Sequence, residues 1–175
     1  SGVLTILRQM GANIRLLDER LCGDEPVADL EVRASQLRGI ELDPGLVPLA
    51  IDEFPALFIA AACADGESRF SGLAELRVKE SDRIRAMAEG LSTLGIELQE
   101  FPDGILIKGG QIGGGTVESH GDHRIAMSFA VAATRASGPV RIADVAAVDT
   151  SFPGFVVCMQ SLGVDITQEK DIHNG

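Results

Sequence analysis

The chain has 175 residues, of which 45% are hydrophobic and 23% are charged, a composition typical of a soluble globular protein with one domain or most of one. Its formal net charge of -11 argues against a nucleic-acid partner and against an anionic membrane surface, because both require a surplus of Lys and Arg. No apolar run reaches the length of a membrane span, and three widely separated cysteines predict a reducing cytoplasm rather than a metal site or a disulfide framework.

The first predicted element is a helix that begins with the first residues of the chain. No initiator Met precedes it, so we expect the chain to be part of a longer protein. The helix stops at Gly11 and an alternating segment follows, and the same order recurs at Gly95 and Gly163. Glycine past the last helical turn adopts the left-handed C-cap conformation, and alternation marks a strand with one buried face. The repeat therefore predicts a helix, a glycine stop and a strand three times.

Two predicted helices further along the chain, at residues 56–64 and 125–133, are almost entirely apolar. A helix without a polar face is buried on all sides, so both should run through the middle of the domain. Each is followed by a short strand, at residues 67–73 and 139–143. Cys63 and Cys158 lie in apolar helical stretches, and we expect both to be small buried side chains.

A one-sided helix at residues 84–94 and a hairpin at residues 96–108 complete the repeating unit. The helix carries apolar residues at three-and-four spacing, and a Pro-Asp-Gly turn joins the two alternating arms of the hairpin. A unit thus consists of helix, strand, helix, strand and strand. The predicted fold class is α/β, or α+β, with sheets packed around buried helices.

Polar residues stand at four predicted loop-to-helix junctions, at residues 52–55, 79–83, 121–124 and 150–153. Asp, Ser and Thr are common N-caps and proline is tolerated in a first turn. Each junction is therefore explained, taken singly, as the start of a helix.

Four cations stand beside these helix N-termini, whose partial charge is already positive: Lys79, Arg83, His123 and Arg124. A bound anion would make this arrangement favourable, because backbone N–H groups, helix dipole and guanidinium groups would act in the same direction. The alternative is ion pairing with the neighbouring acids Glu80, Asp82 and Asp122. The residues alone leave both interpretations open.

Two carboxylates, Asp52 and Glu80, stand where apolar and polar sequence meet. Asp52 is explained as a helix cap and Glu80 as a salt-bridge partner. Acid–base chemistry is the other interpretation, and it requires both side chains to face one pocket. His123 is similarly either a hydrogen-bonded residue of a first helical turn or a site residue.

Two of these segments resemble signatures of the EPSP synthase family. Residues 79–83 read Lys-Glu-Ser-Asp-Arg, and residues 121–124 read Gly-Asp-His-Arg. The spacing between them, the upstream Ile-Asp-Glu at residues 51–53 and the segment at residues 150–153 match as well. The resemblance covers nearly the whole chain, whereas enolpyruvyl transferases acting on a nucleotide sugar share the fold but not these two signatures.

The resemblance implies the enolpyruvyl transferase fold, an inside-out α/β barrel type of two similar domains with sheets packed around buried parallel helices. Residues 1–175 would form most of the C-terminal domain, without the family's N-terminal domain. The implied reaction transfers the enolpyruvyl group of phosphoenolpyruvate to the 5-hydroxyl of shikimate 3-phosphate in aromatic amino-acid biosynthesis, with no metal or other cofactor. The chain by itself would be inactive, because the missing part holds most of the shikimate 3-phosphate site.

Carried over from the family, the catalytic residues are Asp52, Glu80 and Lys79. Asp52 would accept the hydroxyl proton and hold the shikimate ring, while Glu80 would exchange protons with the reacting methylene group. Lys79 would contact both substrates and contribute to proton transfer.

The resemblance also implies substrate-binding residues. Arg83 and Arg124 would bind the phosphate and carboxylate of phosphoenolpyruvate, and His123 would support that site. Two positions depart from part of the family, which has asparagine at the position of Glu75 and lysine at that of Thr150, so the resemblance assigns these two residues no role.

Two rival functions remain from the sequence. One is a non-catalytic ligand-binding or scaffold module with the same fold, which the presence of all six site residues disfavours. The other is an RNA-end cyclase built from related folding units, which the net charge of -11 disfavours because RNA is a polyanion.

Overall fold

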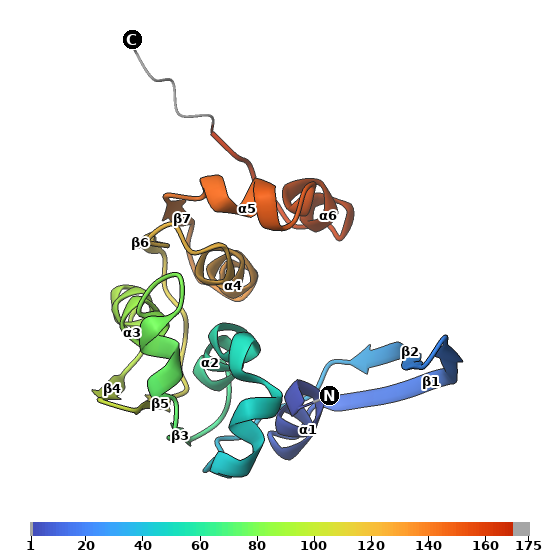
Figure 1. Ribbon diagram of the computed structural model, residues 1–175. Helices are drawn as coiled ribbons and strands as arrows, with labels where there is room; N and C mark the ends of the chain where they lie inside the picture. Colours follow the sequence, from blue (N-terminus) through green and yellow to red (C-terminus); the bar gives the residue numbers. More distant parts are fainter. Residues whose placement is uncertain (1, 170–175) are drawn as a thin grey trace.

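The computed structural model describes residues 2–169, a mixed α/β chain arranged around three helices that lie side by side (Figure 1). Its α-helices are α1 (Gly2–Gln9), α2 (Phe54–Ala62), α3 (Arg83–Thr93), α4 (His123–Ala133), α5 (Ala146–Ser151) and α6 (Phe155–Ser161). Three 3-10 helices are η1 (Pro44–Leu49), η2 (Ile51–Glu53) and η3 (Ala74–Val78). The strands are β1 (Asn13–Cys22), β2 (Glu25–Arg33), β3 (Glu67–Phe70), β4 (Leu98–Phe101), β5 (Gly104–Lys108), β6 (Gly115–Glu118) and β7 (Val140–Ala143).

The described strands form three small sheets. Strands β1 and β2 make an antiparallel hairpin, β3 and β4 flank β5 in an antiparallel sheet, and β6 pairs in parallel with β7. The order α2, β3, α3, β4, β5 is the predicted unit of helix, strand, helix, strand and strand. The predicted α/β class is confirmed, and none of the sheets formed by residues 2–169 closes into a barrel.

The predicted glycine stops are confirmed at all three positions, but only two of the three strands form. Gly11, Gly95 and Gly163 have φ angles of 94°, 87° and 86°, the left-handed region in which side chains with a Cβ are strained. Strand β1 follows the first stop and β4 the second. Residues 164–169 after the third stop are irregular. Alternation alone does not make a strand, because the backbone also needs a paired strand, and no strand among the described residues pairs with this segment.

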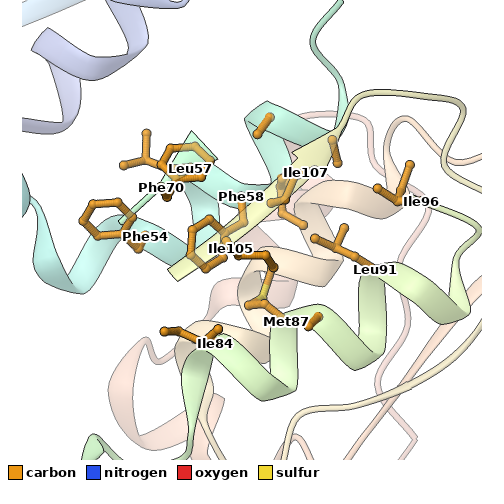
Figure 2. Close-up of a cluster of buried hydrophobic side chains, with 14 of the residues drawn as sticks. Phe54, Leu57, Phe58, Phe70, Ile84, Met87, Leu91, Ile96, Ile105 and Ile107 are labelled. Carbon is orange, nitrogen blue, oxygen red and sulfur yellow. The ribbon is translucent and has the colours of Figure 1, made fainter. Parts of the chain in front are cut away.

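Helices α2, α3 and α4 build the core with the sheet of β3, β4 and β5 (Figure 2). Three aromatic rings pack where α2 meets β3, with ring centroids 5.3–6.0 Å apart: Phe54, Phe58 and Phe70. The predicted burial of both apolar helices is largely confirmed. The exception on α4 is Val131, which is about half exposed and shows that this helix has one open face.

The prediction that both helical cysteines are buried is wrong for Cys158. It lies on α6, where Val157 is also exposed, as is Leu162 just after the helix. Met159 alone on this helix is buried, and Phe155 and Val156 are partly buried. Cys63 ends α2 and is partly buried, and this burial raises the pKa of its thiol.

The β1–β2 hairpin extends away from the three-helix body (Figure 1). Four of its large apolar side chains are exposed: Leu17, Leu21, Leu30 and Val32. Neither strand pairs with a third strand in residues 2–169, so this sheet has two open edges.

Gly90 of α3 packs against the ring of Phe129 on α4, and we expect Gly90→Ala to destabilise the chain. A Cβ at position 90 would stand 2.1 Å from Cζ of Phe129, a fully buried ring. Forcing an extra methyl group into a filled core costs about 1–3 kcal/mol, more than the roughly 1 kcal/mol gained by alanine in a helix. The chemical denaturation midpoint should therefore fall. Ser92→Ala, an exposed change on the same helix, is the control, and a midpoint raised equally by both changes would contradict the close approach.

Candidate active site

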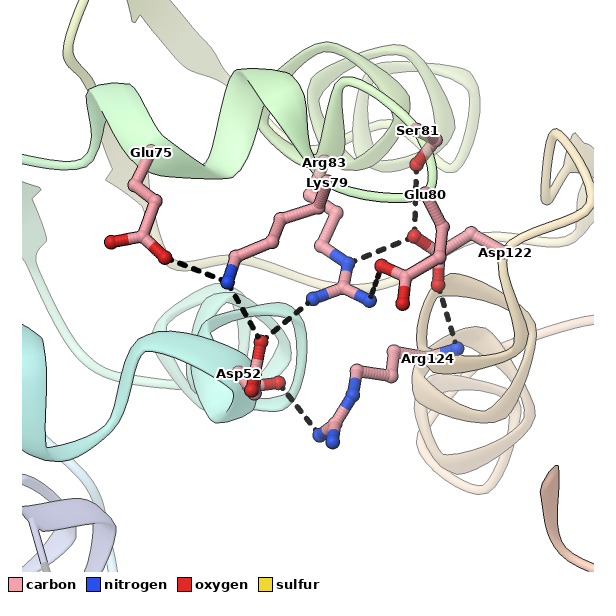
Figure 3. Close-up of polar contacts among 8 residues, drawn as sticks. All are labelled: Asp52, Glu75, Lys79, Glu80, Ser81, Arg83, Asp122 and Arg124. Carbon is pink, nitrogen blue, oxygen red and sulfur yellow. Dashed lines mark hydrogen bonds and ion pairs between the residues drawn. The ribbon is translucent and has the colours of Figure 1, made fainter.

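Three of the four predicted junctions meet in space (Figure 3). Asp52 lies in η2 before α2, the segment from Lys79 to Asp82 leads into α3, and Asp122 leads into α4. The predicted caps are confirmed for two helices, since Asp82 Oδ1 accepts from the Arg85 amide at 3.0 Å and Asp122 Oδ1 from the Arg124 amide at 2.9 Å. Because α2, α3 and α4 lie side by side, their N-terminal ends bring residues from three distant segments together.

Arg83 is the centre of this cluster. Its side chain is only 1% exposed and donates to three carboxylates: Asp122 Oδ2 at 2.8 Å, Asp52 Oδ1 at 3.1 Å and Glu80 Oε2 at 2.5 Å. Burial by itself would lower the pKa of this guanidinium, but the surrounding carboxylates outweigh it and raise that pKa. Arg83 therefore stays charged and fixes the relative positions of the three junctions.

Asp122 is the buried partner that the sequence presented only as a cap or a possible ion-pair partner. Its side chain has no exposed surface, and it accepts from Arg83 Nε, from the Arg124 amide and from Ser81 Oγ at 3.0 Å. Burial alone would raise the pKa of Asp122, yet the hydrogen bonds and the charge of Arg83 hold it below its usual value. In the sequence, Asp122 is recognisable as an N-cap aspartate in a segment rich in cations. Its pairing with Arg83 could not be predicted, because the two residues are 39 positions apart.

We expect the Asp122→Asn variant to lose stability in a pH-dependent way. A carboxylate whose pKa is lowered by folding stabilises the native state above its unfolded pKa of about 3.9, and this contribution disappears as the pH falls through the still lower folded pKa. The variant should be less stable at neutral pH by about 1.5–3 kcal/mol, the range for hydrogen bonds to charged groups. Urea denaturation at several pH values would show the difference shrinking below about pH 4. Ser81→Ala removes a neutral donor from the same carboxylate, and an equal pH dependence in that control would refute the assignment.

Asp52 and Lys79 face each other beside Arg83. Lys79 Nζ is 3.5 Å from Asp52 Oδ1 and 2.7 Å from Glu75 Oε1. Burial would raise the pKa of Asp52, but the charges of Lys79, Arg124 and Arg83 together lower it. The hydrogen bond to Glu75 is the largest influence on Lys79, and with the charge of Asp52 it raises the pKa of this ammonium group. Asp52 is thus ionised and Lys79 protonated at neutral pH.

Arg124 reaches the same place from α4. Its Nη1 donates to the backbone carbonyl of Asp52 at 3.0 Å, and its side chain forms no salt bridge with any residue between 2 and 169. The predicted ion pairing is confirmed for Arg83, which binds Glu80 and Asp122, whereas Lys79 pairs instead with Glu75 and Asp52. The charge of Arg124 is left for another anion. This combination of paired and unpaired cations is compatible with a site for an anionic ligand.

One residue and one segment singled out from the sequence lie outside this network. His123 begins α4 and is partly exposed, and none of the contacts that join the cluster involves it. The expectation that residues 150–153 begin a helix is wrong, because Thr150 and Ser151 end α5, and α6 starts after Gly154, which has a φ of 83°. Gly154 occupies the N-cap position without a side-chain cap, and glycine adopts this left-handed conformation without strain.

No group of three or more His, Cys, Asp or Glu residues within 2–169 is arranged to hold a metal ion. None of the helices in the same range is long and apolar enough to span a bilayer.

A family model and the most similar curated sequences point to the same family. Residues 1–172 match the family model described as EPSP synthase (3-phosphoshikimate 1-carboxyvinyltransferase). The 3-phosphoshikimate 1-carboxyvinyltransferase of Methylococcus capsulatus is 61% identical over 166 residues, which are 95% of this chain and 38% of that protein. The enzyme of the same name from Alkalilimnicola ehrlichii is 59% identical over 169 residues, covering 96% of this chain and 38% of that protein.

Solved structures show the same relationship. EPSP synthase from Acinetobacter baumannii superimposes with a TM-score of 0.89 at 51% identity, over 92% of this chain and 38% of that one. The enolpyruvyl transferase NikO from Streptomyces tendae superimposes with a TM-score of 0.65 at 18% identity, over 95% of this chain and 36% of that one, which shows a common fold alone. The chain thus spans about 38% of the length of the curated relatives it matches.

Proposed function

Since the chain belongs to the EPSP synthase family, we propose that it forms most of the C-terminal domain of an enzyme that makes 5-enolpyruvylshikimate 3-phosphate. The enzyme would take phosphoenolpyruvate and shikimate 3-phosphate as substrates and release phosphate. The observation that carries the proposal is the meeting of Asp52, Lys79, Glu80, Arg83 and Arg124 at three helix starts. The remaining part of the enzyme would close this site from the other side.

In this proposal Asp52 is the proton acceptor. Its lowered pKa keeps it ionised near neutral pH, so it can accept the proton of the 5-hydroxyl group as that oxygen attacks C2 of phosphoenolpyruvate. Glu80 would protonate the methylene carbon and later remove a proton as phosphate leaves. Its side chain is about half exposed, and within residues 2–169 its ion pair is with Arg83, so it can move towards a substrate.

The cations would hold the substrates and stabilise the charge that develops on them. Arg124 has the guanidinium group most available to the phosphate or carboxylate of phosphoenolpyruvate, because its only partner among the described residues is a backbone carbonyl. Arg83 already binds three carboxylates, so it would reach a substrate only as Glu80 turns away. Lys79 would contact both substrates, and His123, one residue before Arg124, would support the phosphoenolpyruvate site.

A chimeric enzyme tests the proposal. This chain would replace the matching 166 residues of the Methylococcus capsulatus relative, and phosphate release would be measured with both substrates. We expect the chimera to release phosphate and the isolated chain to release none. A folded chimera without activity, alongside an active parent relative, would instead favour the non-catalytic ligand-binding or scaffold module.

We also propose a cytoplasmic location for the enzyme. The three cysteines are free, which fits a reducing compartment. A full-length protein that fractionates with the cytoplasmic enzymes would support this placement.

A further inference from the structure

The cluster holds more negative than positive charge. Three cations, Lys79, Arg83 and Arg124, face four carboxylates, Asp52, Glu75, Glu80 and Asp122. An excess of carboxylates weakens the attraction of a site for anionic substrates. None of the four carboxylates can attract an anionic substrate, so each must have another role.

Three of the carboxylates hold Arg83, and only Glu75 does not. Asp122 is buried and also caps α4, while Asp52 and Glu80 each contact Arg83 directly. Glu75 contacts Lys79, one turn further along the chain, and its side chain is 62% exposed. It can leave Lys79 without opening the core, because the surrounding water solvates a released carboxylate.

We propose that Glu75 is a positioning residue that holds the Lys79 ammonium group in the free enzyme and competes there with the anionic group of the incoming substrate. The inference rests on the proposed function and adds to it a residue that sets substrate affinity. The geometry supports it, since Lys79 Nζ is 2.7 Å from Glu75 and 3.5 Å from Asp52, so the ammonium is drawn towards Glu75. A substrate phosphate or carboxylate that reaches Lys79 must replace the contact with Glu75.

The charges around Lys79 fix the sign of the expected effects. Asp52 of η2 and Glu75 of η3 face it as anions, and Arg83 of α3 and Arg124 of α4 approach Asp52 as cations. Removing the charge of Glu75 makes the site more positive, so anions bind more tightly. It also lowers the pKa of Lys79, because the interaction with Glu75 is the largest cause of its upward shift.

The test is the Glu75→Gln variant of the full-length enzyme that carries this chain. We expect the KM for phosphoenolpyruvate, for shikimate 3-phosphate or for both to fall about two- to five-fold, the range that corresponds to one exposed ion pair, with a smaller change in kcat. The fall should shrink at about 0.5 M salt, where charges are screened within a few ångströms. The alkaline limb of the kcat/KM profile should move to lower pH as Lys79 loses its proton more readily. Glu75→Asp keeps the charge and should stay closer to the parent KM.

Glu97→Gln is the matched control. It removes another exposed Glu–Lys pair, Glu97 with Lys108 at 2.7 Å, from the sheet of β4 and β5. KM values in this control should equal those of the parent. Unchanged or raised KM values for both substrates in Glu75→Gln would overturn the inference while leaving the proposed function intact. A parent enzyme without phosphate release would instead refute the proposed function.

Discussion

Replacing Arg83 with methionine is expected to reduce the free energy of unfolding by about 3–5 kcal/mol, the cost of removing one partner from a buried ion pair. Arg83 is 1% exposed and Asp122 has no exposed surface, so the variant leaves an ionised carboxylate in the core without its counter-charge. Ser81 and the Arg124 amide still donate to Asp122, but neither supplies a positive charge. Urea denaturation of the full-length enzyme would measure the loss, and phosphate release should disappear with it.

Arg85→Met is the control for this prediction. Arg85 lies on the same helix and pairs with Glu89 at 2.7 Å, close to the 2.8 Å between Arg83 and Asp122, but its side chain is mostly exposed. Its denaturation midpoint should stay close to that of the parent. In the double variant Arg83→Met with Asp122→Asn, the second change should cost less than it does alone, because the isolated charge is gone. Strictly additive losses would show that the two residues do not act as a pair.

In the proposed full-length enzyme, replacing Glu80 with glutamine is expected to lower kcat by about 10²–10⁴-fold, the usual contribution of a general acid–base group. The amide oxygen of glutamine can still accept from Arg83, and position 80 is half exposed, so the fold should survive. Phosphate release under saturating substrates measures kcat. Exchange of solvent deuterium into the methylene group of phosphoenolpyruvate should fall in parallel.

The matched control for Glu80 is Glu89→Gln, an exposed glutamate that also binds an arginine of α3. It should leave kcat unchanged, since it lies outside the cluster. A loss below about ten-fold in Glu80→Gln would assign the proton transfer to another residue, and Lys79 is the next candidate within the cluster.

Sequence patterns predicted the local structure of this chain well. Apolar periodicity located α2 and α4, and turn chemistry located the β4–β5 hairpin, because both depend on neighbouring residues. Cap chemistry located Asp82 and Asp122 at the starts of α3 and α4 for the same reason. The prediction of a strand after Gly163 was wrong, since a strand also depends on a partner strand elsewhere in the chain.

The arrangement of the site was only partly accessible from the sequence. The signatures named Lys79, Glu80, Arg83 and Arg124, but the charge pattern could not decide between ion pairing and anion binding. The structure contains both, because Arg83 is buried among carboxylates while Arg124 is not. Which residues meet follows from the packing of α2, α3 and α4, and no spacing along the chain encodes that packing.

The β1–β2 hairpin has a practical consequence for work with the isolated chain. Its unpaired backbone groups and its outward leucine and valine side chains form a template onto which a second molecule can add a strand. Samples of the chain by itself should consequently aggregate more as concentration rises, and a lysine at Leu21 or Val32 would be the first change to try for keeping them monodisperse.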